Sequence, residues 1–587
     1  MLFSTNRMDF QTELKKFFKG DIDITDETLS KYSHDASIFE MRPQVVVYPK
    51  DSEDIQNLVQ WVNDNKVAHP ELSITARAAG TCMSGGSINE SIVMDFMRYM
   101  NKLHEVKRVA PYLVTPAFPN ATQCIVTGEA IVEPGIFYRD FEPETLKLGL
   151  VLPSYTASKS VNALGGMIGN NSAGELTLRY GQTTDYVRSL NVILSDGHEY
   201  VFHPITRREL YTKITQVDLE GQVYKKIFDM IKENELLIKS ARPMTSKNAT
   251  GYGIWNVFQK GKTDDEDIFD INRIIVGAQG TLGIATKATL ALVDKPATSK
   301  LVVIFLTKLD KLGDIVDTIL TTKPLTVESY DDKTFKIAMK FFGDFLKTKG
   351  FWNTIKFGLS FIPEFWMILT GGIPKLILLV EYDGKTAEDV QSKCQNLMGT
   401  IAPFALNSRI TKNEKEASKY WDMRRDSFAL LRKHVQGRRT APFIDDIIVS
   451  PHVLPEFLPK LQAILNEYPD IIYTIAGHAG NGNFHIIPLM DFNSEKTIPE
   501  ILELSDLVYD LVVGYKGSIS AEHNDGLVRT PYLVKMYGDQ MIALFKQIKM
   551  IFDPKNIFNP KKKVGGTIDD IRKYVQKPDA PHMTHGS

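Results

Sequence analysis

The segment ARAAGTCMSGGS, residues 76–87, follows SIT (73–75), and together they indicate a strand that runs into a glycine-containing loop. Two more glycine-rich segments come later, ALGGMIGNNSAG at 163–174 and VGAQGTLGIATKATLALV at 276–293. Unhindered N–H groups in such loops can surround phosphate groups. None of the three has the spacing of a Rossmann fingerprint or of a P-loop. One such loop is more often a plain turn, but three in sequence favour a ligand cradle.

The patterns around these loops predict a chain of mixed α and β structure. PQVVVYP (43–49) predicts a strand, and the next segment predicts a helix that Ser52 can cap. After residue 296, VVIFLT (302–307) and LILLVEYDG (376–384) suggest a second α+β domain. We therefore expect a helical segment over 1–40, a first domain over 41–295, a second domain over 296–500, a C-terminal helical segment over 501–575 and a tail over 576–587.

Composition limits the classes of function. The chain has 587 residues, is 43% hydrophobic and carries a formal net charge of −2, which fits a folded soluble protein and gives no support for nucleic-acid binding. Its three cysteines form no CxxC pair, which excludes a disulfide framework and an iron–sulfur cluster held by cysteines alone. Neither a signal-peptide core nor an apolar run of ~20 residues occurs, so we expect a cytoplasmic protein.

The segment 333–370 combines aromatic and basic residues. Phe335, Met339, Phe342 and Phe345 share one helical face, and lysines occupy much of the remainder. A basic amphipathic helix with aromatic residues is typical of peripheral contact with a membrane surface. The alternative is an ordinary helix that packs on its own domain.

Six motifs in order resemble those of the FAD-linked oxidoreductases in the vanillyl-alcohol-oxidase and p-cresol-methylhydroxylase superfamily. The segments 76–87, 165–197 and 276–293 resemble the pyrophosphate loop, the second flavin-contacting segment and the closing segment of the FAD-binding domain. GHAGNGNFH (477–485), SISAEHNDGLVRTPYL and FDPKNIFNPKK resemble the C-terminal domain. The resemblance implies an α+β fold with a two-subdomain FAD-binding domain, an α+β substrate (cap) domain and a C-terminal helical segment that returns to the flavin.

The resemblance also implies the residues that hold a non-covalent FAD, since the loop has no histidine and Cys82 fits a small loop residue better than a flavin anchor. The residues implied for the pyrophosphate are Ala78, Ala79, Gly80, Thr81, Cys82, Ser84 and Gly85. Those implied for the flavin and the ribityl chain are Pro153, Ser154, Gly166, Gly169, Asn170, Ser172 and Gly174, with Ile284 on the adenine side and Asn559 at the isoalloxazine.

The nearest subgroup resembles the D-lactate, glycolate and D-2-hydroxyglutarate dehydrogenases. Oxidising a 2-hydroxy acid requires a base for the hydroxyl proton, a cation for the carboxylate and a hydride acceptor. His523 matches the family's base, and Arg424 matches its carboxylate clamp. Arg425 is the alternative in the neighbouring register, and a surface charge on a helix is the alternative role for Arg424.

A divalent metal, zinc or manganese, is implied at His478, His485 and Glu522. Such an ion would lower the pKa of the substrate hydroxyl beside the base. Asn481 stands where the family usually has aspartate, and Asn524 stands where glycine is usual. Neighbours on a strand point to opposite faces, so a site that uses both Glu522 and His523 requires either a distorted backbone at 524–526 or a substrate that reaches between the two side chains.

Ile444, in FIDDIIVSP (443–451), stands where members specific for a second carboxylate present a lysine. This favours D-lactate as substrate over D-2-hydroxyglutarate, and glycolate stays open. The electrons would pass to a quinone or an electron-transfer protein. Two rival interpretations are a transferase like alkylglycerone-phosphate synthase and a flavin-binding electron-transfer subunit without its own substrate site.

Overall fold

The computed structural model describes residues 10–116, 123–334, 373–434 and 437–576, with side chains up to Arg424 in the helix that ends at residue 434. Its first sheet has the order β1 (Asp21–Asp23), β2 (Val45–Tyr48), β4 (Ile92–Asp95), β3 (Ile74–Arg77), with the last three strands parallel. The strands predicted at 43–49 and before the glycine loop are thereby confirmed.

The helix predicted after β2 is α3 (Ser52–Asn65), whose apolar side packs into the core of this first sheet. The prediction that Ser52 caps it was wrong by one residue. Asp51 is the cap, and its side chain accepts a hydrogen bond from Asp54 N at 3.0 Å. Aspartate and serine are both good N-caps, so the sequence alone could not separate the two positions.

The second sheet is antiparallel and runs in the order β5 (Leu103–Val114), β6 (Cys124–Val132), β13 (Ile284–Asp294), β8 (Val187–Ile193), β9 (Glu199–Phe202), with β7 (Leu150–Val151) beside β13. The short helix α5 (Leu164–Asn170) carries the second glycine-rich segment, and the third one leads directly into β13. The three glycine segments therefore belong to the part of the chain that contains these two sheets.

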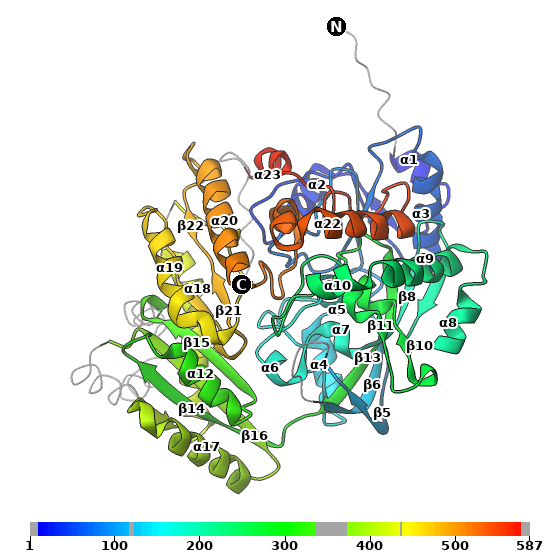
Figure 1. The fold of residues 1–587 in the computed structure, drawn as a ribbon. Helices are drawn as coiled ribbons and strands as arrows, with labels where there is room; N and C mark the ends of the chain where they lie inside the picture. Colours follow the sequence, from blue (N-terminus) through cyan, green and yellow to red (C-terminus); the bar gives the residue numbers. More distant parts are fainter. Residues whose placement is uncertain (1–9, 117–122, 335–372, 435–436, 577–587) are drawn as a thin grey trace.

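A seven-stranded antiparallel sheet forms the other large part of the molecule (Figure 1). Its order is β17 (Asn407–Ile410), β14 (Thr298–Leu306), β16 (Leu376–Gly384), β15 (Thr326–Asp331), β20 (Ile475–His478), β21 (Asn483–Ile486), β19 (Ile447–Ile448). The strands predicted at 302–307 and 376–384 are β14 and β16.

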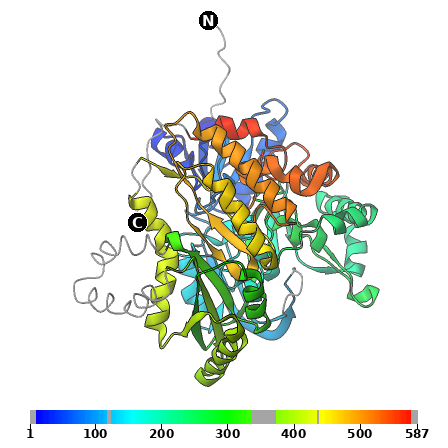
Figure 2. The same cartoon turned by 60° about the vertical axis from the view of Figure 1, so that its left-hand side comes forward.

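Alternate side chains of β14 enter different cores. Val302 and Ile304 pack with α12 (Leu312–Thr321) and α17 (Ala387–Ile401), whereas Val303 packs with α18 (Glu414–His434). This alternation is what a strand covered on both faces requires. Figure 2 shows α18 and α17 at this sheet from a second direction. The helix α18 thus lies against the sheet and carries Arg424 toward β15.

The C-terminal part is helical, with α20 (Thr497–Gly514), α21 (Gly526–Arg529), α22 (Leu533–Phe552) and α23 (Ile568–Tyr574). The chain then returns to the first sheet, where Ile74 N donates to Ile557 O at 2.8 Å and Asn559 N donates to Ile74 O at 2.9 Å. In Figure 1 the red C-terminal helices lie beside the blue N-terminal ones. The return of the C-terminal segment is therefore confirmed.

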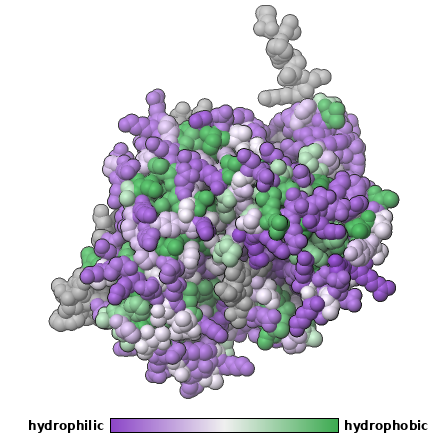
Figure 3. All heavy atoms as spheres, viewed as in Figure 1, coloured by the Kyte–Doolittle hydropathy of each residue, from purple (hydrophilic) through white to green (hydrophobic). Residues whose placement is uncertain are grey.

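The surface seen in Figure 3 mixes hydrophilic and apolar residues. Within the described ranges, no helix combines the length and the apolar character needed to cross a membrane. The basic aromatic segment 333–370 lies almost entirely outside the described residues, so its membrane role stays a prediction. The domain limits expected from the sequence also stay predictions.

Candidate flavin cleft and active site

A cleft opens between the loop 76–87, α5 and the segment 275–285. Two of its glycines, Gly166 and Gly169, place no side chain in the cleft. A Cβ atom on Gly166 would meet its nearest neighbour at 3.9 Å, and one on Gly169 would do so at 4.0 Å, so both would occupy the cleft itself. Side chains at these positions would therefore fill the space that a flat cofactor needs. The small residues and backbone N–H groups around the cleft fit the phosphates and ribityl chain of FAD.

Eight of the predicted FAD residues line this cleft, namely Ala78, Ala79, Gly80, Thr81, Cys82, Gly166, Gly169 and Asn170. The eight others are not among the residues that line it, namely Ser84, Gly85, Pro153, Ser154, Ser172, Gly174, Ile284 and Asn559. Arg77 and Gln279 line the cleft and were not predicted. The family resemblance identified the residues of the glycine loop as FAD contacts, but it did not identify the longer side chains beside that loop.

Asn559 is fully buried and joins the two sides of the cleft. Its amide nitrogen donates to Gly86 O at 2.8 Å and to Gln279 O at 2.7 Å, and its amide oxygen accepts from Thr75 Oγ1 at 2.8 Å. These contacts engage both polar atoms of the side chain and hold the backbone at Gly86 and Gln279 in place. A contact of Asn559 with the isoalloxazine stays a prediction.

Cys82 shapes the pyrophosphate loop from within. Its buried Sγ accepts a hydrogen bond from Gly86 N at 3.4 Å and lies 3.2 Å from Ser84 Oγ. Burial raises the pKa of this thiol, which disfavours the nucleophilic thiolate. These contacts agree with the expectation of a small loop residue.

The segment GHAGNGNFH forms a hairpin in which β20 pairs with β21 across the short turn Ala479–Asn481. Gly482 has φ +70°, and a Cβ there would clash with Val449 O, so only glycine fits this tight turn. The hairpin brings His478 and His485 together, with ring centroids 5.4 Å apart. The stretch is therefore a rigid, sterically constrained turn.

Glu522 meets both histidines from the segment before α21. Its Oε1 lies 3.4 Å from His478 Nε2, 3.4 Å from His485 Nε2 and 4.0 Å from His523 Nε2. The rings of His485 and His523 stack with centroids 5.1 Å apart and an angle of 25° between planes. The structure therefore brings His478, His485, Glu522 and His523 into one cluster, as predicted.

The backbone at 522–526 bends so that neighbouring side chains reach the same site. Asp446 Oδ2 accepts from Glu522 N at 2.8 Å and from His523 N at 2.7 Å, and Asn524 follows with φ +70°. Of the two alternatives, the distorted backbone is therefore the one observed. Asn524, which stands where glycine is usual, also donates to Asn170 O at 3.0 Å and Gly277 O at 2.8 Å. The cluster is thereby attached to the walls of the flavin cleft.

Three buried charged residues that sequence reasoning missed hold this cluster. Glu328 Oε1 accepts from His478 Nδ1 at 2.7 Å, and Lys247 Nζ donates to Glu522 Oε2 at 2.7 Å. Asp445 lies between two rings, with Oδ1 3.1 Å from His485 Nδ1 and Oδ2 2.7 Å from His523 Nδ1. The three come from separate segments, so no motif spacing connects them. The sequence feature that could have indicated them is a charged residue between apolar neighbours, as in FIDDIIVSP.

The buried charges shift one another's pKa values. Burial alone would raise the pKa of Glu328, but Arg424 and His478 lower it to about 2. Burial would likewise raise the pKa of Asp445, but His523 and His485 hold it well below its ordinary value. Burial would lower the pKa of His485, but Asp445 and Glu522 raise it to about 10. In the metal-free protein the cluster is therefore a set of mutually compensating charges.

Arg424 pairs with Glu328 through Nη2 and Oε2, and only 7% of its side chain is exposed. The alternative of a surface charge on a helix is therefore wrong, and the side chain of Arg425 lies outside the described part of α18.

Ile444 is buried in the core. Asn481 donates to Ser246 Oγ at 2.8 Å and so fastens the hairpin to the segment that carries Lys247.

The donor set fits a divalent metal. One ligand atom from each of His478, His485 and Glu522 lies within 4.8 Å of the other two. The Nδ1 atoms of the two histidines face Glu328 and Asp445, which leaves Nε2 of each ring for a metal. Two imidazoles and one carboxylate with open positions suit zinc. Asp445, His485 and His523 form a second, overlapping set of the same size.

Two family models match the chain. A model of the FAD binding domain covers residues 43–202, and a model of the C-terminal domain of FAD-linked oxidases covers residues 295–563. Among curated relatives, the D-2-hydroxyglutarate dehydrogenase of Pseudomonas putida is 27% identical over 95% of this chain and 52% of its own length. The D-lactate dehydrogenase of Archaeoglobus fulgidus is 25% identical over 89% of this chain and 91% of its own. The chain spans about half the length of the first relative.

Solved structures show the same fold. An alkyldihydroxyacetonephosphate synthase superposes with a TM-score of 0.63 at 15% identity, over 96% of this chain and 86% of its own. A substrate-bound p-cresol methylhydroxylase superposes with a TM-score of 0.61 at 16% identity, over 95% of this chain and 97% of its own. With the glycine-walled cleft and both domain models in place, the chain belongs to the FAD-linked oxidases, with their FAD binding domain over residues 43–202 and their C-terminal domain over residues 295–563.

Proposed function

We propose that the protein oxidises a D-2-hydroxy acid to the 2-oxo acid. The observation that carries this proposal is the cluster of His478, His485, Glu522 and His523, which is fastened to the flavin cleft. Ser84 Oγ donates to His523 O at 3.2 Å, and Asn524 donates to the backbone of Asn170 at 3.0 Å. Bound FAD supplies the hydride acceptor for C2 of the substrate. The names of the relatives support the same substrate class.

His523 is the proposed base. Asp445 Oδ2 lies 2.7 Å from its Nδ1, which favours a proton on that nitrogen and leaves Nε2 to accept the substrate's hydroxyl proton. Arg424 is the proposed clamp for the carboxylate because a planar guanidinium can hold it with two parallel hydrogen bonds. Zinc or manganese held by His478, His485 and Glu522 would make the hydroxyl more acidic.

D-lactate is our favoured substrate, because Ile444 is apolar and buried where a lysine would serve a second carboxylate. D-2-hydroxyglutarate and glycolate are the alternatives. A transferase like alkylglycerone-phosphate synthase is disfavoured by the histidine and glutamate set.

We further propose that a quinone or an electron-transfer protein accepts the electrons, and that the segment 333–370 makes peripheral contact with a membrane. Liposome flotation of wild type against a Phe341→Ser/Phe342→Ser variant would test the membrane contact.

Anaerobic addition of D-lactate to the FAD-loaded enzyme tests the function. The flavin band at about 450 nm should bleach, because the cofactor carries the electrons. The same experiment with L-lactate should leave the band unchanged. No bleaching by any member of a panel of D- and L-2-hydroxy acids, with or without added zinc or manganese, would sink the proposal. Turnover of an acylated dihydroxyacetone phosphate would support the transferase instead.

A further inference from the structure

Glu328 occupies a position between two of the proposed functional residues. It lies on β15, and only 1% of its side chain is exposed. Its Oε1 accepts from His478 Nδ1 at 2.7 Å and from Thr326 Oγ1 at 2.9 Å, while Oε2 pairs with the guanidinium of Arg424. One carboxylate therefore serves a proposed metal ligand and the proposed substrate clamp.

The shared carboxylate makes the two partners depend on each other. The contact with His478 fixes the imidazole so that Nε2 faces Glu522 at 3.4 Å. The contact with Arg424 compensates a guanidinium that is almost completely buried. A change in the position or charge of Arg424 must therefore change the field and the geometry that Glu328 gives to His478.

The other buried partners of the cluster do not make this connection. Asp445 contacts His485 and His523, and Lys247 contacts Glu522 and Asn483. Glu328, in contrast, is a carboxylate that contacts both Arg424 and a proposed metal ligand, His478. Asp445 is therefore a natural control, since it also holds a ligand histidine but does not hold the clamp.

We propose that Glu328 is a positioning residue that couples recognition of the substrate carboxylate at Arg424 to metal binding at His478. The proposal rests on the proposed function. A carboxylate bound by Arg424 neutralises the cation beside Glu328 and leaves more of the negative charge of Glu328 to support a metal-bound His478. Such coupling is reciprocal, so a bound metal must tighten carboxylate binding by the same factor.

Zinc binding to the FAD-loaded enzyme, with and without propionate, tests this coupling. Propionate has the carboxylate but no 2-hydroxyl, so it can occupy the clamp without oxidation at C2. Its binding is verified by inhibition of D-lactate-driven flavin bleaching. In the wild type, saturating propionate should tighten zinc binding, measured by competition with a chromophoric chelator, by at least about fivefold. In Glu328→Gln the effect should fall below about twofold.

Two further variants keep the test decisive. Asp445→Asn should weaken zinc binding and yet keep the propionate effect. Glu328→Asp keeps the charge but is one methylene shorter, so it should lose the effect, and it replaces Glu328→Gln if that variant does not fold. An unchanged propionate effect in the Glu328 variants, or none in a zinc-binding wild type, overturns the coupling. A wild type that binds no zinc overturns the coupling and the proposed metal together, while D-lactate bleaching still tests the oxidation separately.

Discussion

At the scale of single residues, His523 is the side chain on which the proposed chemistry depends most directly. Its ring is 23% exposed, and its Nε2 lies 4.0 Å from Glu522 Oε1. Replacing it by asparagine removes the base but keeps a polar side chain. We expect the rate of anaerobic flavin reduction by D-lactate to fall by about 10²–10⁴.

His452→Asn is the matched control for this change, because the side chain of His452 is 72% exposed and pairs with Asp317, which is itself 46% exposed, and not with a residue of the cluster. Its rate of flavin reduction should stay within about twofold of wild type. If His523→Asn reduced the flavin as fast as this control, His523 would not be the base. Stopped-flow absorbance of both holoenzymes makes the comparison.

His485 predicts a pH dependence of stability in the metal-free protein. Burial would lower its pKa, but Asp445 and Glu522 raise it to about 10 in the folded state. A raised pKa means that the stabilisation is complete below about pH 6.5 and is lost as the pH rises toward about 10. In EDTA, the thermal midpoint of wild type should therefore exceed that of His485→Gln most at pH 6, with the gap closing toward pH 10.

Added zinc should reverse this trend, since a histidine must lose its proton to bind the metal. With excess zinc, the advantage of wild type over His485→Gln should grow from pH 6 to pH 8. A gap that is independent of pH in EDTA would contradict the assignment of a charged His485. Differential scanning fluorimetry at each pH is sufficient for both series.

The sequence predicted functional residues well where they lie within a recognisable motif. GHAGNGNFH and AEHNDG supplied His478, His485, Glu522 and His523, and the structure places all four together. Glu328, Asp445 and Lys247 escaped because each comes from a different segment and acts through burial. Their partners become visible only when β15, β21 and the segment around residue 247 are packed together. No regular spacing in the sequence identifies a charged residue that becomes buried.

At the scale of elements, the first turn of α21 lies directly on the pyrophosphate loop. Gly526 has φ +50°, its N–H donates to Gln279 Oε1 at 2.8 Å, and Leu527 N donates to Ser84 O at 2.8 Å. A Cβ on Gly526 would clash with Ser84 O. Gly526→Ala should displace the loop and weaken FAD binding by about tenfold or more, as measured by fluorescence titration of the apoprotein.

Gly538→Ala separates this clash from the general cost of a left-handed backbone. Gly538 has φ +68° inside α22, and a Cβ there would meet no atom within 4 Å. Both variants carry the backbone penalty of about 1 kcal/mol, but only Gly526→Ala meets the loop. Equal FAD affinities in the two variants would mean that the contact with Ser84 does not shape the cleft.

Strands were easier to predict than the connections between sheets. Apolar runs such as LILLVEYDG coincide with β16, because a strand covered on both faces must be apolar throughout. The order of the seven-stranded sheet, in which β15 pairs with both β16 and β20, is not encoded in any local pattern. It depends on long-range packing, which a single sequence does not display.

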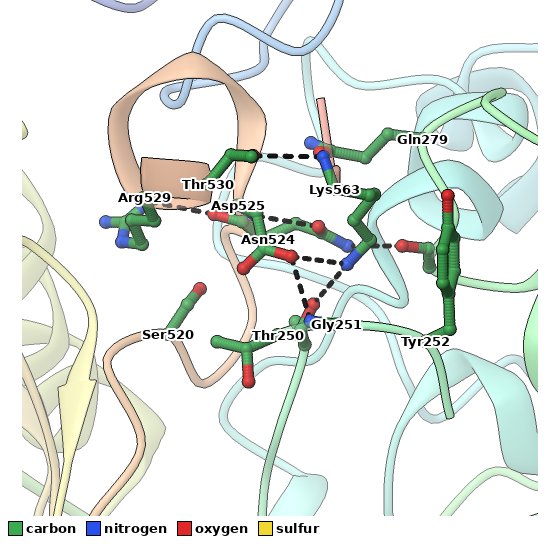
Figure 4. A network of polar contacts seen from close by, with 12 residues as sticks. Thr250, Gly251, Tyr252, Gln279, Ser520, Asn524, Asp525, Arg529, Thr530 and Lys563 are labelled. Carbon is green, nitrogen blue, oxygen red and sulfur yellow. Dashed lines mark hydrogen bonds and ion pairs between the residues drawn. The ribbon is translucent and has the colours of Figure 1, made fainter. Parts of the chain in front are cut away.

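At the scale of the whole molecule, a buried ion pair joins three distant parts of the chain (Figure 4). Asp525 Oδ2 accepts from Lys563 Nζ at 2.9 Å and from Gly251 N at 2.9 Å, while Lys563 Nζ also donates to Ala249 O at 2.9 Å. Both side chains of the pair are fully buried. The return of the C-terminal segment therefore fixes the loop that carries His523.

Lys563→Met should destabilise the holoenzyme by about 3–5 kcal/mol, because Asp525 would remain buried without its cation. Burial raises the pKa of Asp525 and lowers that of Lys563, so each charge depends on the other. The exposed pair of Arg572 and Asp569, at 57% and 87% exposure, is the control, and Arg572→Met should cost less than about 1 kcal/mol. Urea unfolding followed by flavin fluorescence and by circular dichroism measures both.

The double variant Asp525→Leu/Lys563→Met distinguishes an electrostatic tie from simple packing. If the cost of Lys563→Met is an unpaired buried carboxylate, removing that carboxylate should restore part of the stability. If the lost stability came from packing alone, the second substitution would add its own cost and the double variant would be the least stable. FAD affinity should follow stability in this series, because the loop fixed by Asp525 also holds Asn524 against Asn170 O in the wall of the cleft.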